Sequence, residues 1–215
     1  VDGLSALPFE MEVEHFKKRC KQLRTPGLVD GGPPSTTHIS VIDGTGNAVA
    51  VTLSHGESNA YNIGNSGIMM NNFLGESDLL PQGFGTAPPG LRLATMMSPT
   101  IGLTPQGGIL ALGTGGANRI RSAIMQSLWH LVAEEMSPQS SIKAPRMHYE
   151  GGELNLETFD RALDMQRLEA SIPSGINEFH EPNLYFGGVN CAVSRPGGTF
   201  DGAGDPRRGG VCLFA

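Results

Sequence analysis

Residues 31–43, "GGPPSTTHISVID", change from a tether to a strand within a few positions. The first four residues suit neither a helix interior nor a sheet interior, because proline lacks an amide N–H and glycine costs backbone entropy. Apolar and polar residues then alternate in "TTHISVI", which predicts a strand that begins at Thr36. The boundary is either a simple domain junction or a place where the chain is cut, leaving Thr36 as a new N-terminus.

The composition limits the fold and the partners of the chain. Its 215 residues include 30 glycines and 15 prolines and are only 17% charged, which predicts a loop-rich β or α+β protein with one sizeable core. A net charge of -6 argues against a general affinity for nucleic acid or for membrane surfaces. No apolar run approaches the roughly 20 residues of a membrane span, so we expect a soluble chain. The sequence leaves the compartment open between the bacterial periplasm and the cytoplasm.

Cysteine and histidine give no sign of a metal site or a disulfide framework. The three cysteines are far apart, and no pair of the six histidines has the spacing of a zinc-binding helix. We therefore expect no metal and no cofactor. The chain starts at Val1 without a signal peptide, which suggests a trimmed protein or a fragment.

The order of the expected elements is strands, helices, strands, which predicts α+β layers. A short helix is expected over residues 9–24 and the strongest helix over 118–135, where apolar residues recur at helical spacing. A shorter helix is expected over 158–170, through Phe159, Leu163 and Leu168. Hairpins are expected at 36–54, with its turn at 43–47, and at 98–114, with its turn at "TPQGG".

Thr36 is the first candidate for chemistry. A threonine hydroxyl is a weak nucleophile unless a base takes its proton, and an N-terminal threonine carries such a base in its own amine. A free α-amino group has a pKa of about 7.7, so part of it is neutral at physiological pH. The same hydroxyl could first attack the Ser35–Thr36 peptide bond and release that terminus by an N-to-O acyl shift. The alternative is an ordinary strand-initiating threonine.

Other polar positions have both a functional and a structural interpretation. The N–H groups of "GTGGANRI", residues 113–120, could hold an oxyanion, or the glycines could serve close packing of a helix on a strand. Glu76 and Asp78 could hold a substrate ammonium group or be solvated loop charges. Thr95 and Ser98 are candidate binding hydroxyls or ordinary turn residues.

In this order the motifs resemble the small, catalytic subunit of the gamma-glutamyltranspeptidase family. The resemblance runs through "TTHISVIDGTGNAVAVT", "GIMMNN", "MMSPTI", "GTGGANRI", "KAPRMHYEG" and "GDPRRGG", nearly all of residues 36–209. It implies an N-terminal-nucleophile hydrolase with a four-layer αββα core, of which this chain supplies about half. It also implies a precursor that cuts itself before Thr36, so that residues 1–35 end a large subunit and 36–215 form the small catalytic subunit.

The resemblance also implies roles for individual residues. Gly116 and Ala117 stand where the family has the two N–H groups of its oxyanion hole, and Ser54 stands where a hydroxyl supports the nucleophile. Glu76 matches an acid that binds the α-amino group of a γ-glutamyl substrate such as glutathione. The remaining substrate positions all depart from the family pattern or match it loosely: Thr95, Met96, Phe73 and Asn59.

These departures leave the acyl donor open. Phe73 and Met96 make the pocket more apolar than glutamine and serine would. A related acylase acting on glutaryl or cephalosporin amides is therefore the alternative, and a silent family member that only binds is a third. The core is expected to need the large subunit of the same precursor. A chain with the Ser35–Thr36 bond intact would lack the amine, be inactive, and pair with a copy of itself.

Overall fold

The computed structural model describes residues 36–57, 61–160, 163–172 and 175–214. The expected helix at 9–24 lies outside these residues. In chain order, the elements are β1 (Thr37–Ile42), β2 (Ala48–Leu53), η1 (Phe73–Gly75), η2 (Ser77–Leu79), β3 (Thr100–Leu103), β4 (Ile109–Gly113), α2 (Arg119–Leu128), η3 (Trp129–Ala133), α3 (Pro138–Lys143), β5 (Met147–Glu150), β6 (Glu153–Glu157), α4 (Met165–Ser171), β7 (Ile176–Phe179), η4 (Leu184–Phe186), β8 (Asn190–Arg195), β9 (Thr199–Ala203) and η5 (Pro206–Arg208). No helix of the described residues is long and apolar enough to cross a membrane.

The chain divides into two compact units. One includes residues 54–94 and the other combines residues 36–53 with the chain from Thr95 onward. The first unit holds the short 3₁₀ turns η1 and η2 and a single bridge between Asn62 and Met69. Leu79 and Leu80 are its buried apolar residues. Its regular structure is sparse because glycine and proline recur throughout residues 75–90.

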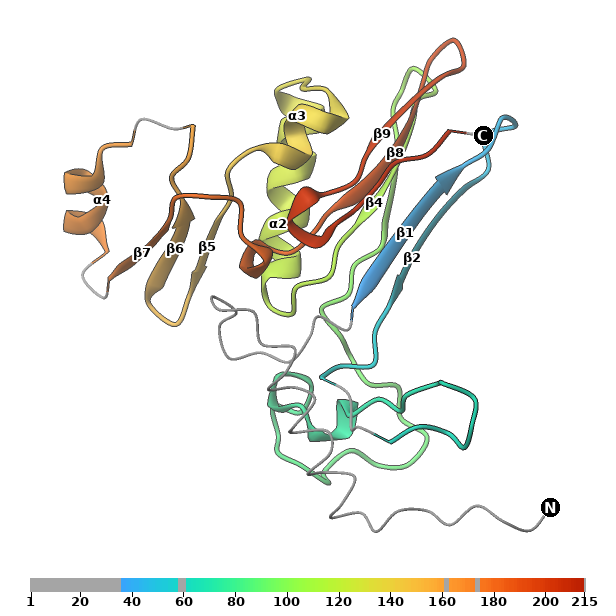
Figure 1. The fold of residues 1–215 in the computed structure, drawn as a ribbon, viewed down its shortest axis with the longest axis vertical. Coiled ribbons are helices and arrows are strands. Elements are labelled where there is room, and N and C mark those ends of the chain that lie inside the picture. Colours follow the sequence, from blue (N-terminus) through green and yellow to red (C-terminus); the bar gives the residue numbers. More distant parts are fainter. Residues whose placement is uncertain (1–35, 58–60, 161–162, 173–174, 215) are drawn as a thin grey trace. The chain divides into compact units, whose positions relative to one another are not determined.

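A four-stranded antiparallel sheet, in the order β3-β4-β8-β9, is the centre of the second unit (Figure 1). Strand β4, with the sequence ILALG, is buried along almost its whole length because both of its faces are covered. The predicted hairpin at 98–114 is β3 and β4, joined through "TPQGG", where Gly107 N–H donates to Thr104 O.

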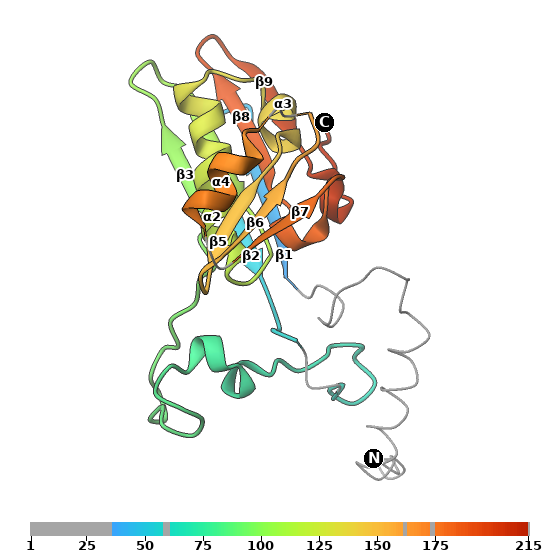
Figure 2. The ribbon, with the colours of Figure 1, turned by 90° about the vertical axis from the view of Figure 1, so that its left-hand side faces the viewer.

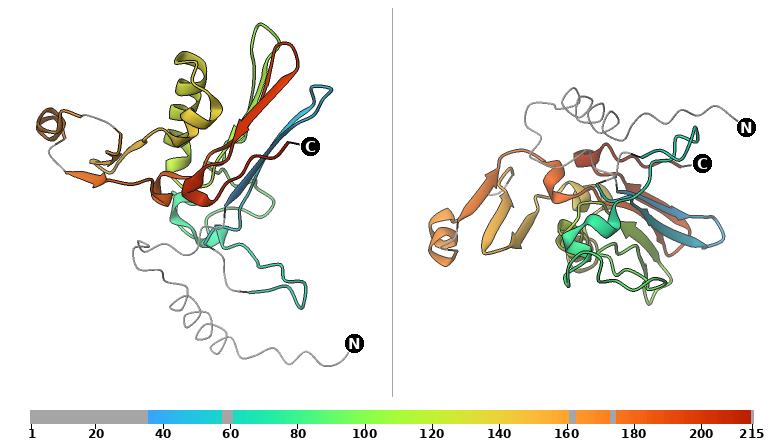
Figure 3. Two further views of the ribbon diagram at one scale, coloured as in Figure 1. Left: turned by 45° about the horizontal axis from the view of Figure 1, so that its top comes forward. Right: turned by 90° about the horizontal axis from the view of Figure 1, so that it is seen from below.

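The hairpin β1–β2 packs on one face of this sheet, and helices α2 and α3 lie on the other (Figures 1 and 3). Its alternation is reversed from that of an ordinary surface hairpin. The inward face carries His38, Ser40 and Thr52, whereas the outward face carries apolar residues that are 40–54% exposed: Ile39, Val41, Val49, Val51 and Leu53. The register sets Ile39 opposite Val51 and Val41 opposite Val49.

Helix α2 is shorter than the 118–135 interval expected from its periodicity. It runs over Arg119–Leu128 and continues as one turn of π-helix, η3. Its buried face, which includes Ile120, Ala123 and Ile124, packs with Leu112 of β4 and Ile142 of α3 in the main core. The predicted apolar stripe is confirmed from Ile120 to Leu131, but Val132, which was expected to widen it, is exposed. The helical hydrogen-bond pattern changes at Trp129.

A second sheet, in the order β5-β6-β7, lies on the far side of α2 from the central sheet (Figure 2). Strands β5 and β6 are antiparallel, and β6 and β7 are parallel, with α4 in the connection between them. The helix expected over 158–170 was placed too early, since α4 begins at Met165. Asp164 ends the preceding loop by accepting the N–H of Arg167 at 3.1 Å, as an N-cap does.

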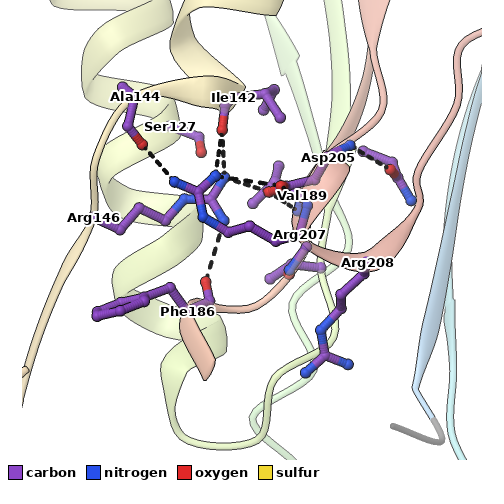
Figure 4. Close-up of polar contacts among 12 residues, drawn as sticks. Ser127, Ile142, Ala144, Arg146, Phe186, Val189, Asp205, Arg207 and Arg208 are labelled. Carbon is purple, nitrogen blue, oxygen red and sulfur yellow. Dashed lines mark hydrogen bonds and ion pairs between the residues drawn. The ribbon is translucent and has the colours of Figure 1, made fainter. Parts of the chain in front are cut away.

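Two arginines and two carboxylates form a buried ionic cluster where these layers meet. Figure 4 shows both arginines and one of the carboxylates, Asp205. Arg146, Glu157, Asp205 and Arg207 are at most 8% exposed. Arg207 contacts Glu157 Oε2 at 2.5 Å, and Arg146 contacts Asp205 Oδ2 at 2.7 Å. The two guanidinium groups also donate to the carbonyls of Ile142, Ala144 and Phe186. The formal charges cancel, so the cluster can remain buried.

We expect Glu157→Gln to destabilise the full-length protein by about 3–5 kcal/mol, because two buried guanidinium groups, Arg146 and Arg207, are then left with the single carboxylate of Asp205. Chemical denaturation of the purified variant measures this loss. Glu153→Gln, on the same strand but exposed, is the matched control and should change the free energy of unfolding by less than about 0.5 kcal/mol. Equal effects of the two substitutions would contradict the role of the cluster.

Candidate active site

Thr36 lies directly before β1, against the glycine-rich loop that follows β4. A Cβ built on Gly115 would come within 2.9 Å of Thr36 Cβ and 2.7 Å of Thr36 O. Only glycine therefore allows this approach. The structure thus brings together Thr36 and the "GTGGANRI" loop, which are about eighty positions apart in the sequence.

The backbone of this loop is held in an unusual conformation. Gly116 has φ of +140° and its Cα side faces Gly187, where an added Cβ would come within 2.9 Å of Gly187 Cα. Ala117 has φ of +47°, a left-handed value that costs a residue with a Cβ about 1–2 kcal/mol. Within the described part of the chain, the N–H groups of Gly116 and Ala117 have no acceptor. Both are available to an oxyanion.

His38 connects the strand of Thr36 to the end of β4. Its Nδ1 lies 2.7 Å from Thr52 Oγ1 and its Nε2 lies 2.8 Å from Ser40 Oγ. The ring occupies the space that a side chain on Gly113 would need. Asn190 of β8 donates from Nδ2 to His38 O at 3.0 Å, which fixes the backbone two residues after Thr36. Burial lowers the pKa of His38 to about 4.

Three of the predicted site residues lie in the other unit. Ser54 Oγ accepts the N–H of Gly56 at 3.1 Å, and Glu76 Oε1 accepts the N–H of Glu57 at 2.9 Å. Gly56 has φ of +68° and packs so tightly on the Glu76 carboxylate that no Cβ would fit. The turn 55–57 therefore brings Ser54 and Glu76 together. Phe73 opens η1, half-buried, three residues before Glu76.

The remaining predicted residues are distributed differently. Thr95 is exposed and its Oγ1 accepts the N–H of Met97 at 3.3 Å, whereas Met96 is half-buried and packs against the main core. Ser35 and Asn59 lie outside the described residues. No group of three or more His, Cys, Asp or Glu side chains in the described ranges is placed to hold a metal ion.

Sequence reasoning missed the roles of His38 and Asn190. His38 stands in the "TTHISV" motif, and its place on the inward face follows from strand alternation. Its partner Asn190 is 152 positions away along the chain, so no local pattern could pair them. A histidine within an apolar alternation was the one available signal.

We expect the stability of the full-length protein to depend on His38 below pH 6.5. The folded-state pKa of about 4 lies below the ordinary value of 6.5, so only the unfolded state takes up this proton between those values. Stability is thus fully present above pH 6.5 and falls as the pH drops toward 4. Chemical denaturation at several pH values should show a weaker decline in His38→Gln than in the wild type.

His180→Gln is the control, since His180 is exposed on the second sheet's side of the chain. It should retain the wild-type decline between pH 6.5 and 4. Parallel stability profiles for the wild type and His38→Gln would show that folding leaves the pKa of His38 unchanged, which would contradict this prediction.

Comparison with known proteins identifies the family. The family model described as gamma-glutamyltranspeptidase matches residues 12–215. The Acylase ACY 1 proenzyme of Pseudomonas sp. (strain SE83) is 34% identical over 181 residues, covering 83% of this chain and 32% of that protein. The glutathione hydrolase proenzyme of Bacillus subtilis (strain 168) is 24% identical over 205 residues, covering 90% and 32%.

The fold agrees with these matches. A gamma-glutamyltranspeptidase from Pseudomonas nitroreducens, solved with L-DON, aligns with a TM-score of 0.67 and 22% identity, covering 83% of this chain and 99% of that one. The expected α+β fold is thereby confirmed. The chain spans about a third of the length of the curated relatives that it matches. It belongs to the gamma-glutamyltranspeptidase family.

Proposed function

We propose that the protein transfers or hydrolyses γ-glutamyl groups of glutathione and related amides through an acyl ester on Thr36. The observation that carries this proposal is the position of Thr36 against Gly115, next to the two N–H groups of Gly116 and Ala117. A nucleophile and an oxyanion site on adjacent backbone segments are the two parts that acyl transfer requires.

The proposed reaction uses the amine of Thr36 as its base. The amine takes the proton of the hydroxyl while Oγ attacks the substrate carbonyl carbon, and the oxyanion accepts hydrogen bonds from Gly116 and Ala117 N–H. The intermediate collapses, the proton passes to the leaving amine, and the γ-glutamyl group stays as an ester on Oγ. Water or a second amine then attacks the ester, which yields hydrolysis or transfer.

The amine has to be produced by cleavage of the Ser35–Thr36 bond. In the proposed maturation, Oγ attacks the carbonyl carbon of Ser35, an ester replaces the peptide bond, and water releases the Ser35 carboxylate. Residues 1–35 then end the large subunit and 36–215 form the small one. Uncleaved protein has no free amine at Thr36 and is inactive in this scheme.

Substrate positioning is proposed for the residues named by the family pattern. Glu76 would hold the α-amino group, since its second carboxylate oxygen remains beside the one that accepts Glu57 N–H. Ser54 would support the nucleophile. Thr95, Met96, Phe73 and Asn59 would line the rest of the acyl site, where two of them offer no hydrogen bond.

The proposed protein partner is the large subunit of the same precursor. The outward face of β1–β2 exposes five apolar side chains in a contiguous cross-strand arrangement, which is unusual for a surface in water. Covering that face would bury these apolar side chains. A copy of the same chain could cover it instead, and the mass of the assembled protein in solution distinguishes these partners.

We expect Thr36→Ala in the full precursor to abolish both cleavage and turnover, with turnover reduced by about 10³ or more, because one hydroxyl serves both reactions. Thr36→Ser keeps a hydroxyl and an amine and should retain partial activity. Mass spectrometry of the chains and release of p-nitroaniline from γ-glutamyl-p-nitroanilide measure the two steps. Thr37→Ala, at the exposed first residue of β1, is the control. Turnover by Thr36→Ala at the wild-type rate would refute the assignment.

An acylase that accepts glutaryl-type or cephalosporin side chains is the second candidate. The 34% identity to an acylase proenzyme and the apolar Phe73 and Met96 favour it. If it holds, glutaryl amides are turned over faster than glutathione. Met96→Ser should then raise kcat/KM for γ-glutamyl-p-nitroanilide by up to about tenfold, the worth of one added hydrogen bond. A preference for glutathione that Met96→Ser leaves unchanged would exclude this explanation of the pocket.

A further inference from the structure

The two adjacent arginines of η5 have opposite surroundings. Arg207 reaches into the buried ionic cluster, whereas Arg208 extends away from it (Figure 4). The side chain of Arg208 lies on Gly188, where an added Cβ would come within 2.6 Å of Arg208 Cδ. Its Nη2 makes one long hydrogen bond, 3.4 Å, to Leu184 O, and its Nε is buried with no acceptor in the described part of the chain.

Arg119 is a second cation beside Arg208. Its Nε donates to Tyr185 O at 3.1 Å, and its guanidinium carbon lies 4.6 Å from the centre of the Tyr185 ring. Leu184 and Tyr185 are consecutive, so the two guanidinium groups contact consecutive carbonyls. The ion pairs among the described residues include neither arginine. Burial, and then the charge of Arg119, lower the pKa of Arg208.

This pair of cations adjoins the proposed catalytic residues. A Cβ on Gly187 would come within 2.7 Å of Gly115 O. The next residue, Gly188, packs against the side chain of Arg208. Arg119 itself donates its backbone N–H to Gly116 O at 3.0 Å. One run of close glycine contacts therefore connects Thr36, the oxyanion loop and the two arginines.

We propose that Arg208, together with Arg119, binds a carboxylate of the substrate. This inference rests on the proposed function and names a recognition group for it. A partly buried guanidinium without a counter-ion is unfavourable, and a carboxylate that accepts from Nε and an Nη satisfies both the charge and the orphan donor. Asp205, whose charge acts on Arg208, is already shared by Arg146 and Arg207, which leaves the site for a ligand.

The test compares two donors of equal length in the matured full-length protein. Glutaryl-p-nitroanilide carries a terminal carboxylate, and its methyl ester does not. We expect Arg208→Met to raise KM for the glutaryl donor by roughly 10- to 100-fold and to leave the ester unchanged, since a charge-assisted contact is lost only for the former. Arg208→Lys should recover part of the loss. Arg195→Met, an exposed arginine on β8, controls for the change in net charge.

A second arm tests whether the bound carboxylate belongs to the acceptor amine instead of the acyl donor. Glycylglycine and glycylglycine amide serve as acceptors with γ-glutamyl-p-nitroanilide, and a loss confined to glycylglycine places the bound carboxylate on the amine side. Equal losses with charged and uncharged compounds in both arms overturn the proposal. The proposal is also overturned if Arg208→Met impairs assembly of the subunits and leaves donor selectivity unchanged. In that case Arg208 pairs with a carboxylate of the large subunit.

Binding without turnover separates this inference from the proposed function. Titration of glutarate into the Thr36→Ala precursor and into Thr36→Ala/Arg208→Met should show at least tenfold weaker binding to the double variant. Equal binding of glutarate to both overturns the proposal even if Thr36 is the nucleophile. Weaker binding supports it even if neither anilide is cleaved.

Discussion

The rest of the second unit depends on the neutral buried cluster of Arg146, Glu157, Asp205 and Arg207. The two arginines connect elements that are not paired by β-sheet hydrogen bonds. Their guanidinium groups donate to carbonyls at the end of α3 and to the carbonyl of Phe186 in η4. Charges in a low-dielectric interior are tolerated only with full pairing, so the geometry of the cluster has little freedom. The central sheet, α3 and the second sheet are thereby held in one arrangement.

The cluster is two hydrogen bonds from the strand that carries Thr36. Asp205 N–H donates to Asn190 Oδ1 at 3.3 Å, and Asn190 Nδ2 donates to His38 O at 3.0 Å. The ring of His38 then packs against Gly113, at the beginning of the glycine-rich loop 113–117. Acyl transfer requires precise relative placement of a nucleophile and its oxyanion donors, and side chains outside the proposed reaction would position both of the groups proposed for these roles.

Local patterns predicted the parts of this fold that form between neighbours in sequence. Alternation with glycine turns located both hairpins, and helical spacing located α2. The start of α4 is set by the N-cap at Asp164, whereas the apolar spacing of the residues before it predicted an earlier start. Thr36 and the glycine loop could be paired only through the family resemblance. The His38–Asn190 contact and the ionic cluster join residues far apart in the chain, and pairing of that kind is decided by packing.

The outward face of β1–β2 has a consequence for the order of assembly. Each Å² of apolar surface kept in water costs about 25 cal/mol. The hairpin is therefore most prone to aggregate before another segment covers its apolar outward face. A cover tethered in the same chain meets this face at an effective concentration in the millimolar range, whatever the amount of protein in the cell. In a self-cleaving precursor, the cut before β1 would therefore follow folding, because the uncut chain keeps the covering segment close to this face until it is buried.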